Sequence, residues 1–178
     1  HCFQIPELIA ITLCLCGNLT VSQPVQVSEL LDLGLFDILV CLLSNEEASH
    51  ALWVISNMLE CIPQKVLPNI SPEMVLSVIK ATENTSSEFK QEAAFFIGTL
   101  ALVSGINVEL MLIRQEIIEL LIEMLGCGIY YVTLRCIESL QKIATTAIST
   151  ANAAQLSDII NSSDFNDRIE QLNESNDE

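Results

Sequence analysis

The sequence predicts an all-α protein built from a repeated helical unit. Four apolar segments of similar pattern, centred on Asn18, Asn57, Thr99 and Lys142, follow one another at intervals of 39, 42 and 43 residues. A nearly constant period in the range of about 20 to 50 residues is typical of solenoids, whose repeats stack on their neighbours. Within each segment the apolar residues recur at three- and four-residue spacing, and no segment alternates cleanly at a period of two. The pattern therefore favours stacked helices and no sheet.

Turn signals place the boundaries of the individual helices. Gly34 separates two short helices, Gly105 ends the third long one, and Pro63 and Pro68 break up another short segment. Ser71, followed by a proline in the first turn, is a typical helix start. Long helices are predicted over residues 6–20, 46–61, 88–104 and 130–149, and shorter ones over residues 25–33, 35–43, 71–82, 108–115, 117–125 and 153–161.

The composition narrows the classes of function. The chain has 178 residues, 51% of them hydrophobic and 5% aromatic, which is enough for one sizeable aliphatic core. Its net charge is −16, with 23 acidic and 7 basic residues, so we expect no direct contact with nucleic acid. The charge suits a cationic partner, but it equally suits plain solubility. The uncharged run over residues 8–28 contains about a dozen apolar residues, too few to span a membrane.

Cysteine and histidine usage argues against metal or catalytic chemistry. The seven cysteines are odd in number and most lie in apolar helical stretches, as free thiols do in a reducing compartment. There is no CxxC motif, and His1 and His50 are the only histidines, so we expect no metal and no cofactor. No Gly-rich phosphate loop and no histidine beside a nucleophile is present, so an enzyme is not expected. The cysteines are Cys2, Cys14, Cys16, Cys41, Cys61, Cys127 and Cys136.

Trp53 and Asn57 are the strongest candidates for recognition. They are four residues apart, so they share one face of a helix, and Trp53 is the only tryptophan. A lone Trp on an apolar helix is usually a core residue, whereas a buried Asn needs several hydrogen-bond partners. Exposure in a groove would satisfy both side chains, because indole can stack on Lys or Arg and the amide can bond a peptide backbone. We therefore expect both residues to be at least partly exposed.

Repeats of about 42 residues with one short and two longer helices resemble armadillo repeats. HEAT repeats, usually of two helices, are the nearby alternative, and Gly34 at the turn between short helices fits the armadillo pattern better. This resemblance implies a right-handed superhelical solenoid of about four to five armadillo repeats over residues 1–162. An acidic, partly helical segment would follow over residues 163–178.

The stretch Ala51–Asn57 closely resembles the Trp-to-Asn signature of importin alpha, the nuclear import adaptor family. Residues 90–99 resemble that family's next repeat, with Phe95 and Thr99 in place of its Trp and Asn. Asn18 matches the Asn of the repeat before, and residues 167–173 resemble the short helix that precedes the family's last helix. The resemblance thus covers nearly the whole chain, as the last four to five of about ten repeats.

The resemblance implies a concave groove that binds basic nuclear localisation signals at the family's minor site. Trp53 would stack on basic side chains and Glu92 would pair with a cation. The departures are Cys14 and Glu138 at the Trp position and Lys142 at the Asn position, so the site would fade toward the C-terminus. The implied peptide-binding residues are Asn18, Trp53, Ser56, Asn57, Glu92, Phe95 and Thr99.

The resemblance also implies partners and a location. Importin beta would bind through an N-terminal segment outside this chain, and an export receptor would bind the last repeats, in a protein that moves between cytoplasm and nucleus. The acidic run over residues 164–178 could contact the export receptor, although its composition favours a flexible solvated tail. The alternatives are an armadillo scaffold for another protein, and a diverged or truncated copy without import activity.

Overall fold

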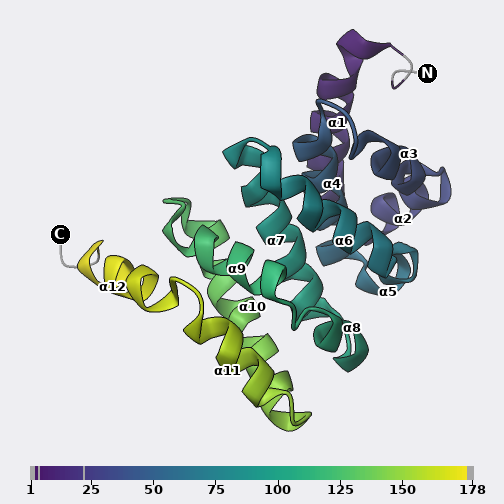
Figure 1. Ribbon diagram of the computed structural model, residues 1–178. Helices are drawn as coiled ribbons and strands as arrows, with labels where there is room; N and C mark the ends of the chain where they lie inside the picture. Colours follow the sequence, from purple (N-terminus) through teal and green to yellow (C-terminus); the bar gives the residue numbers. More distant parts are fainter. Residues whose placement is uncertain (1–2, 4, 22, 176–178) are drawn as a thin grey trace. The chain divides into compact units, whose positions relative to one another are not determined.

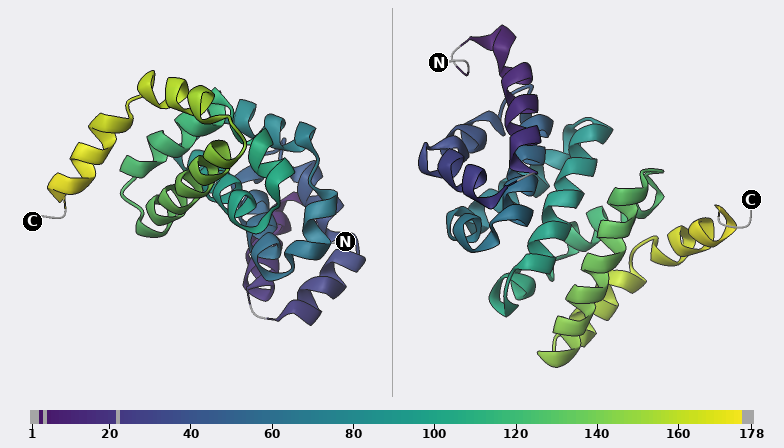
Figure 2. Two further views of the ribbon diagram at one scale, coloured as in Figure 1. Left: turned by 90° about the horizontal axis from the view of Figure 1, so that it is seen from below. Right: turned by 180° about the vertical axis from the view of Figure 1, so that it is seen from behind.

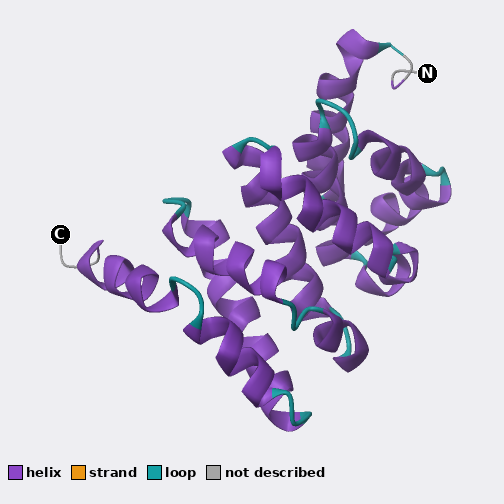
Figure 3. Ribbon diagram, viewed as in Figure 1, coloured by secondary structure: helices purple, strands orange, loops and turns teal. Residues whose placement is uncertain are grey.

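A computed structural model describes residues 3, 5–21 and 23–175, and in this part of the chain helices are joined by turns, with no strand (Figure 3). The helices, in the order in which Figure 1 labels them, are α1 (Pro6–Thr20), α2 (Pro24–Asp32), α3 (Leu35–Leu42), α4 (Ala48–Cys61), α5 (Pro63–Val66), α6 (Pro72–Ala81), α7 (Ser87–Val103), α8 (Ile106–Met111), α9 (Gln115–Glu123), α10 (Tyr130–Ser149), α11 (Ala153–Asn161) and α12 (Phe165–Ser175). Short 3-10 turns are η2 (Leu67–Asn69), η3 (Thr82–Asn84) and η4 (Met124–Gly126). None of the described helices is long and apolar enough to cross a lipid bilayer.

The helix boundaries follow from local chemistry. Pro24 and Pro72 open α2 and α6 in the first turn, where a missing N–H costs nothing. The Ser71 hydroxyl caps α6 by accepting a hydrogen bond of 3.2 Å from the Met74 N–H, as the sequence predicts. Gly34 joins α2 to α3 with φ of 83°, a left-handed conformation that side chains disfavour. The sharp turn predicted at this glycine is confirmed.

The chain divides into two compact units, which we call unit 1 (residues 1–96) and unit 2 (residues 97–178). In unit 1, α4 is the central helix and is packed by α1, α2 and α3 (Figures 1 and 2). Eight of the nine residues of α4 from Ala51 to Leu59 are buried, and Trp53 is the exception. Burial of this kind supplies most of the stability of a helix in a solenoid, because each helix packs on its neighbours along the chain.

In unit 2, α10 is the central helix and is packed by α8, α9, α11 and η4. Its buried side chains include Val132, Cys136, Ser139, Ile143 and Ala147, at three- and four-residue spacing. In both units the central helix is packed by two short helices that precede it in the chain, α2 and α3 for α4, and α8 and α9 for α10.

The C-terminal acidic segment is not a flexible tail over residues 165–175. It forms α12, which packs against α9 and η4. Phe165, Ile169 and Leu172 recur at helical spacing and are only partly exposed, so they give this acidic helix an apolar side. The guanidinium of Arg168 lies over Gly126, 3.1 Å from where a β-carbon of that glycine would be. The expectation of a solvated tail overlooked this apolar side.

Candidate functional site

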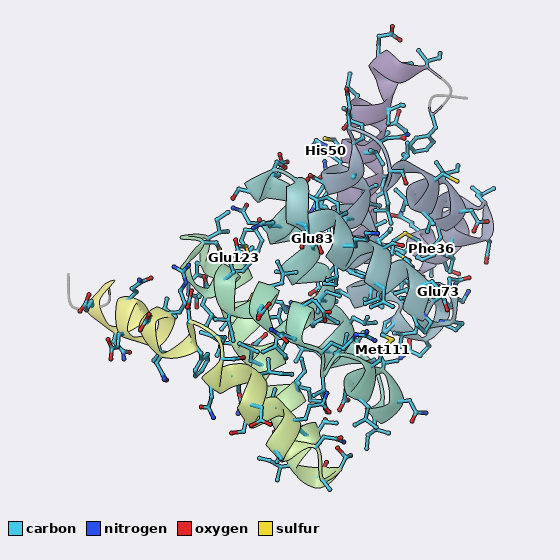
Figure 4. All side chains as sticks on the ribbon, viewed as in Figure 1. Phe36, His50, Glu73, Glu83, Met111 and Glu123 are labelled. Atoms are coloured by element: carbon cyan, nitrogen blue, oxygen red, sulfur yellow. The ribbon has the colours of Figure 1, made fainter. Side chains whose placement is uncertain are left out.

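The indole of Trp53 lies directly on the backbone of α1 at Gly17. A β-carbon built on Gly17 would be only 1.9 Å from Trp53 Cζ3 and 2.2 Å from Cη2, so no side chain fits there. The ring is in contact with bare helix backbone, and the side chain as a whole remains partly exposed. His50, one turn earlier on α4 and labelled in Figure 4, has its Nδ1 3.0 Å from Glu47 Oε2. The ring is therefore held in place while part of it is accessible.

The Asn57 amide is turned toward the same glycine. Its Nδ2 donates a hydrogen bond of 3.4 Å to the Gly17 carbonyl oxygen, and the residue is only 6% exposed. The prediction that both recognition residues are partly exposed is met by Trp53 but is wrong for Asn57. The physical reason is the missing side chain of Gly17, which lets the amide reach a helix carbonyl from a neighbouring helix.

Asn18 provides the exposed amide that Asn57 does not. It follows Gly17 on α1 and is exposed, and Cys14, one turn earlier, is exposed as well. An amide can donate to and accept from a peptide backbone at once. Trp53 of α4 thus lies on Gly17, and the exposed Asn18 is the next residue of α1. We call these two residues, Trp53 and Asn18, the Gly17 site.

Two of the residues implied by the resemblance are fully buried. The Ser56 hydroxyl donates a hydrogen bond of 3.0 Å to the Leu52 carbonyl within α4. The Thr99 hydroxyl accepts one of 3.3 Å from Arg135 Nη1. Both residues are 0% exposed, so in this structure a bound peptide reaches neither. Aligning the repeats by sequence predicts the same exposure for equivalent helix positions. In the structure, the exposure of Ser56 and Thr99 is set by the helices packed around them.

Glu92 and Phe95 lie on α7 within unit 1, and both are partly exposed. Burial raises the pKa of the Glu92 carboxyl from its ordinary value of 4.5 to about 7, and the Glu88 carboxylate one turn earlier adds to this increase. Near neutral pH the carboxyl is therefore partly protonated. A cation placed beside it would favour the ionised form.

We expect the free energy of unfolding to depend on pH through the Glu92 carboxyl. Because the folded state holds the proton to higher pH than the unfolded state, stability from this group is lost as pH rises from 4.5 to about 7. Replacing Glu92 with Gln should remove this loss of stability, so that above neutral pH the variant is more stable than wild type by about 2 kcal/mol. Urea unfolding of both proteins across this pH range measures it. Glu88→Gln, which removes only the smaller cause, should flatten the curve slightly; parallel curves for wild type and Glu92→Gln would contradict the assignment.

In unit 2 two cations, Arg135 and Lys142, pair with polar side chains of the same unit. The aliphatic part of Arg135 lies over Gly98, with Cγ 2.6 Å from where a β-carbon would be, and its Nη1 bonds Thr99. Lys142 Nζ is 3.4 Å from Glu109 Oε1. Two cations on α10 do not favour a basic ligand beside them.

Glu109 is a polar residue that the sequence does not single out. It is 4% exposed, its Oε2 accepts a hydrogen bond from the Thr146 hydroxyl, and its Oε1 pairs with Lys142. A buried carboxylate needs such partners. The signal in the sequence is weak, because its hydrogen-bonding partner is 37 residues away. This pair joins α8 to α10 and is a structural contact.

The cysteines and acidic residues form no metal centre in the described part of the chain. Six cysteines, all except Cys2, lie among the described residues and are free thiols. Burial raises the pKa of Cys136 to about 12 and also raises that of Cys16, so both thiols remain protonated. Cys2 lies outside the described residues.

Comparison with known proteins identifies the fold. No protein-family model matches the chain, and no curated protein matches its sequence. Among solved structures, an engineered protein determined by the Northeast Structural Genomics Consortium has a TM-score of 0.63 and 17% identity over 84% of this chain. A designed armadillo repeat protein, solved in complex with the peptide (KR)4, has a TM-score of 0.62 and 19% identity over 88% of this chain.

The fold is an armadillo-repeat solenoid. The chain spans 63% of the first structure and 70% of the second. At these identities the likeness establishes the fold, as the sequence predicts, and leaves the activity to be argued from the site.

Proposed function

We propose that this chain is an armadillo module that binds an extended basic peptide at the Gly17 site. The observation that carries the proposal is the position of Trp53, whose ring lies on Gly17 while the residue stays partly exposed, with the exposed Asn18 next to Gly17 in the sequence of α1. A fixed indole can stack on the side chain of Lys or Arg, and the amide can bond the peptide backbone. The designed armadillo protein with a similar fold was solved with a peptide of alternating Lys and Arg.

The charge of the chain supports a basic ligand. A net charge of −16 attracts cationic peptides over distance, and this attraction weakens as salt screens it. Glu92 adds a carboxyl on α7 whose ionised form a bound cation would stabilise. Arg135 and Lys142 in unit 2 oppose a basic ligand, so the proposed contacts are confined to unit 1.

The finer proposal is a nuclear import adaptor. It rests on the resemblance of residues 51–57 and 90–99 to importin alpha. The ligands would then be nuclear localisation signals of cargo proteins. Importin beta would bind through an N-terminal segment outside this chain, and an export receptor would bind the C-terminal repeats. Such a protein works without catalysis, in both cytoplasm and nucleus. An armadillo scaffold for another protein partner is the alternative.

Calorimetry with the peptide (KR)4 tests the binding proposal. Replacing Trp53 with Ala should weaken binding about two- to thirty-fold, which corresponds to about 0.5 to 2 kcal/mol of stacking. Trp53→Phe, which keeps a ring, should lose less. Tyr130→Ala is the matched control, because Tyr130 is an aromatic residue of unit 2 that is 81% exposed. Higher salt should weaken binding by all four proteins.

The outcomes separate the alternatives. Equal affinity of wild type and Trp53→Ala would remove the Gly17 site from the mechanism. No binding of (KR)4 by the folded wild-type chain would favour the scaffold for another partner. If (KR)4 binds as expected, a peptide with a nuclear localisation signal and one with its Lys and Arg replaced by Ala then test the import proposal, which requires binding of the first alone.

A further inference from the structure

Gly98 in unit 2 is covered by a side chain of the next long helix, as Gly17 is in unit 1. Each glycine directly precedes the residue on which its repeat is aligned, 18 in the first repeat and 99 in the third. A β-carbon built on Gly98 would be 2.6 Å from Arg135 Cγ and 3.2 Å from its Cδ, so only glycine leaves room for this side chain. The group over the glycine is thus the indole of Trp53 in unit 1 and the alkyl part of a cation in unit 2.

The guanidinium of Arg135 has two polar partners in unit 2. Its Nη1 donates a hydrogen bond of 3.3 Å to the Thr99 hydroxyl, and its Nε is 3.9 Å from Glu138 Oε2, one turn later on α10. The side chain of Arg135 is 19% exposed and that of Glu138 is 47% exposed, so this place opens to solvent. Bare backbone, a hydroxyl and a carboxylate therefore contact one basic side chain. We call Gly98, Thr99 and Glu138 the Arg135 subsite.

The Arg135 subsite has the chemistry that binds a basic side chain. The alkyl part of Arg or Lys packs on apolar surface while the charged end keeps its polar contacts. A guanidinium donates several hydrogen bonds in one plane and is more weakly hydrated than an ammonium, so it loses less in a half-buried place. A ligand that presents the same atoms as Arg135 would find the same contacts if this residue were shortened.

The charges around the subsite also favour one added cation once Arg135 is gone. The two cations of α10 lie near two carboxylates, Arg135 near Glu138 and Lys142 near Glu109. Removing Arg135 leaves the second pair in place and takes the guanidinium away from Glu138, in a chain whose net charge is already −16. A cationic ligand is therefore attracted to the vacated place.

We propose that Arg135 fills a site for a basic side chain in unit 2 and thereby keeps basic peptides out of this unit. In unit 1 the group over the glycine is the indole of Trp53, which attracts cations, whereas in unit 2 it is itself a cation, which repels them. Arg135 is then a specificity-determining residue that limits basic peptides to unit 1. This limit on peptides rests on the proposed function of the Gly17 site, whereas the filled site can be tested with a small ligand alone.

Ethylguanidinium, which has the atoms that Arg135→Ala removes beyond the β-carbon, tests the filled site. It should bind the vacated subsite of Arg135→Ala and stabilise the folded state. At about ten times its dissociation constant, the midpoint of thermal unfolding should rise by about 3 to 6 °C. Ethylurea, a neutral ligand of the same shape, should give no such rise. Wild type, whose site is filled, should respond to neither ligand, and Arg135→Ala together with Glu138→Gln should lose most of the response.

Arg135→Met is the matched control for the ligand experiment. It removes the charge but keeps alkyl carbons over Gly98, so its subsite should stay closed to ethylguanidinium. If Arg135→Ala is unfolded by itself, ethylguanidinium should restore its helical circular dichroism signal. The proposal is overturned if ethylguanidinium leaves Arg135→Ala unchanged, or if it stabilises wild type and Arg135→Met equally well.

Calorimetry with (KR)4 in the Trp53→Ala background tests the effect on peptides. Because the Gly17 site is weakened there, affinity gained by adding Arg135→Ala comes from unit 2, and it should rise about two- to five-fold. Arg114→Ala is the control, because Arg114 is an exposed arginine of unit 2 whose removal changes the net charge equally. An equal rise with Arg114→Ala would overturn the role of Arg135. Failure of wild type to bind (KR)4 would contradict the Gly17 site alone, since ethylguanidinium still decides whether Arg135 fills a site.

Discussion

Replacing Gly17 with alanine should destabilise the protein by about 1 to 3 kcal/mol. The sign is informative, because glycine to alanine inside an exposed helix normally stabilises it by about 1 kcal/mol. Here the new β-carbon would be 1.9 Å from Trp53 Cζ3, so either the ring or α1 must move. Urea unfolding followed by circular dichroism measures the loss, and fluorescence of the only tryptophan reports displacement of the ring.

Two further variants isolate the ring as the cause. Gly105→Ala is the matched control, because a β-carbon there meets nothing within 4 Å, and it should leave stability nearly unchanged. Trp53→Ala removes the obstacle, so in that background Gly17→Ala should become neutral or stabilising. A loss that is the same with and without the ring would mean that the Gly17 contact does not constrain α1.

Replacing Thr146 with valine should lower the free energy of unfolding by about 2 to 3 kcal/mol. The change keeps the shape of the side chain but removes the hydroxyl that donates to Glu109 Oε2. The carboxylate would remain 4% exposed and keep Lys142 at Oε1, but its Oε2 would face a methyl group in place of a donor, and a buried charged acceptor without its hydrogen bond is costly. Urea unfolding provides the measurement, and Thr145→Val, on an exposed position of the same helix, is the control.

Removal of both partners should restore most of that stability. Glu109→Leu together with Thr146→Val puts two apolar groups in contact, which is often nearly neutral compared with the bonded polar pair. Lys142 would lose its partner but is 43% exposed, so water can solvate it. If the double variant is as unstable as Thr146→Val alone, the carboxylate is not the origin of the loss.

The fold could be predicted from the sequence because its signals are local. The spacing of apolar residues gives α10 and α11 with the bounds that the structure has, and Gly34 and Ser71 mark turns that are found. The misplaced elements are those that depend on distant contacts. Helix α8 begins at Ile106, directly after Gly105, rather than at residue 108. The segment 165–175 looks like an acidic tail unless α9 is there to cover its apolar side.

The site was less predictable, because its geometry depends on one glycine in another repeat. Periodicity places Trp53 and Asn57 on one face of α4, and this is correct. It does not reveal that Gly17, 40 residues earlier, accepts the Asn57 amide and thereby buries it. Similarly, nothing around Thr99 indicates that Arg135 will reach it from α10. Contacts of this kind follow from stacking and become visible only with the helices in place.

The glycine that makes room for Trp53 also makes α1 a weak helix on its own. Glycine disfavours helix by about 1 kcal/mol, no side chain caps the N-terminus of α1, and Glu7 is its single charge, so ionic pairs cannot support it. Isolated helices of this length are marginal in water even with good sequences. Helix α1 is therefore ordered by α4 rather than by its own sequence. Local opening of this end of unit 1 would separate Asn18 from Trp53, and the two halves of the Gly17 site would be lost in a single event.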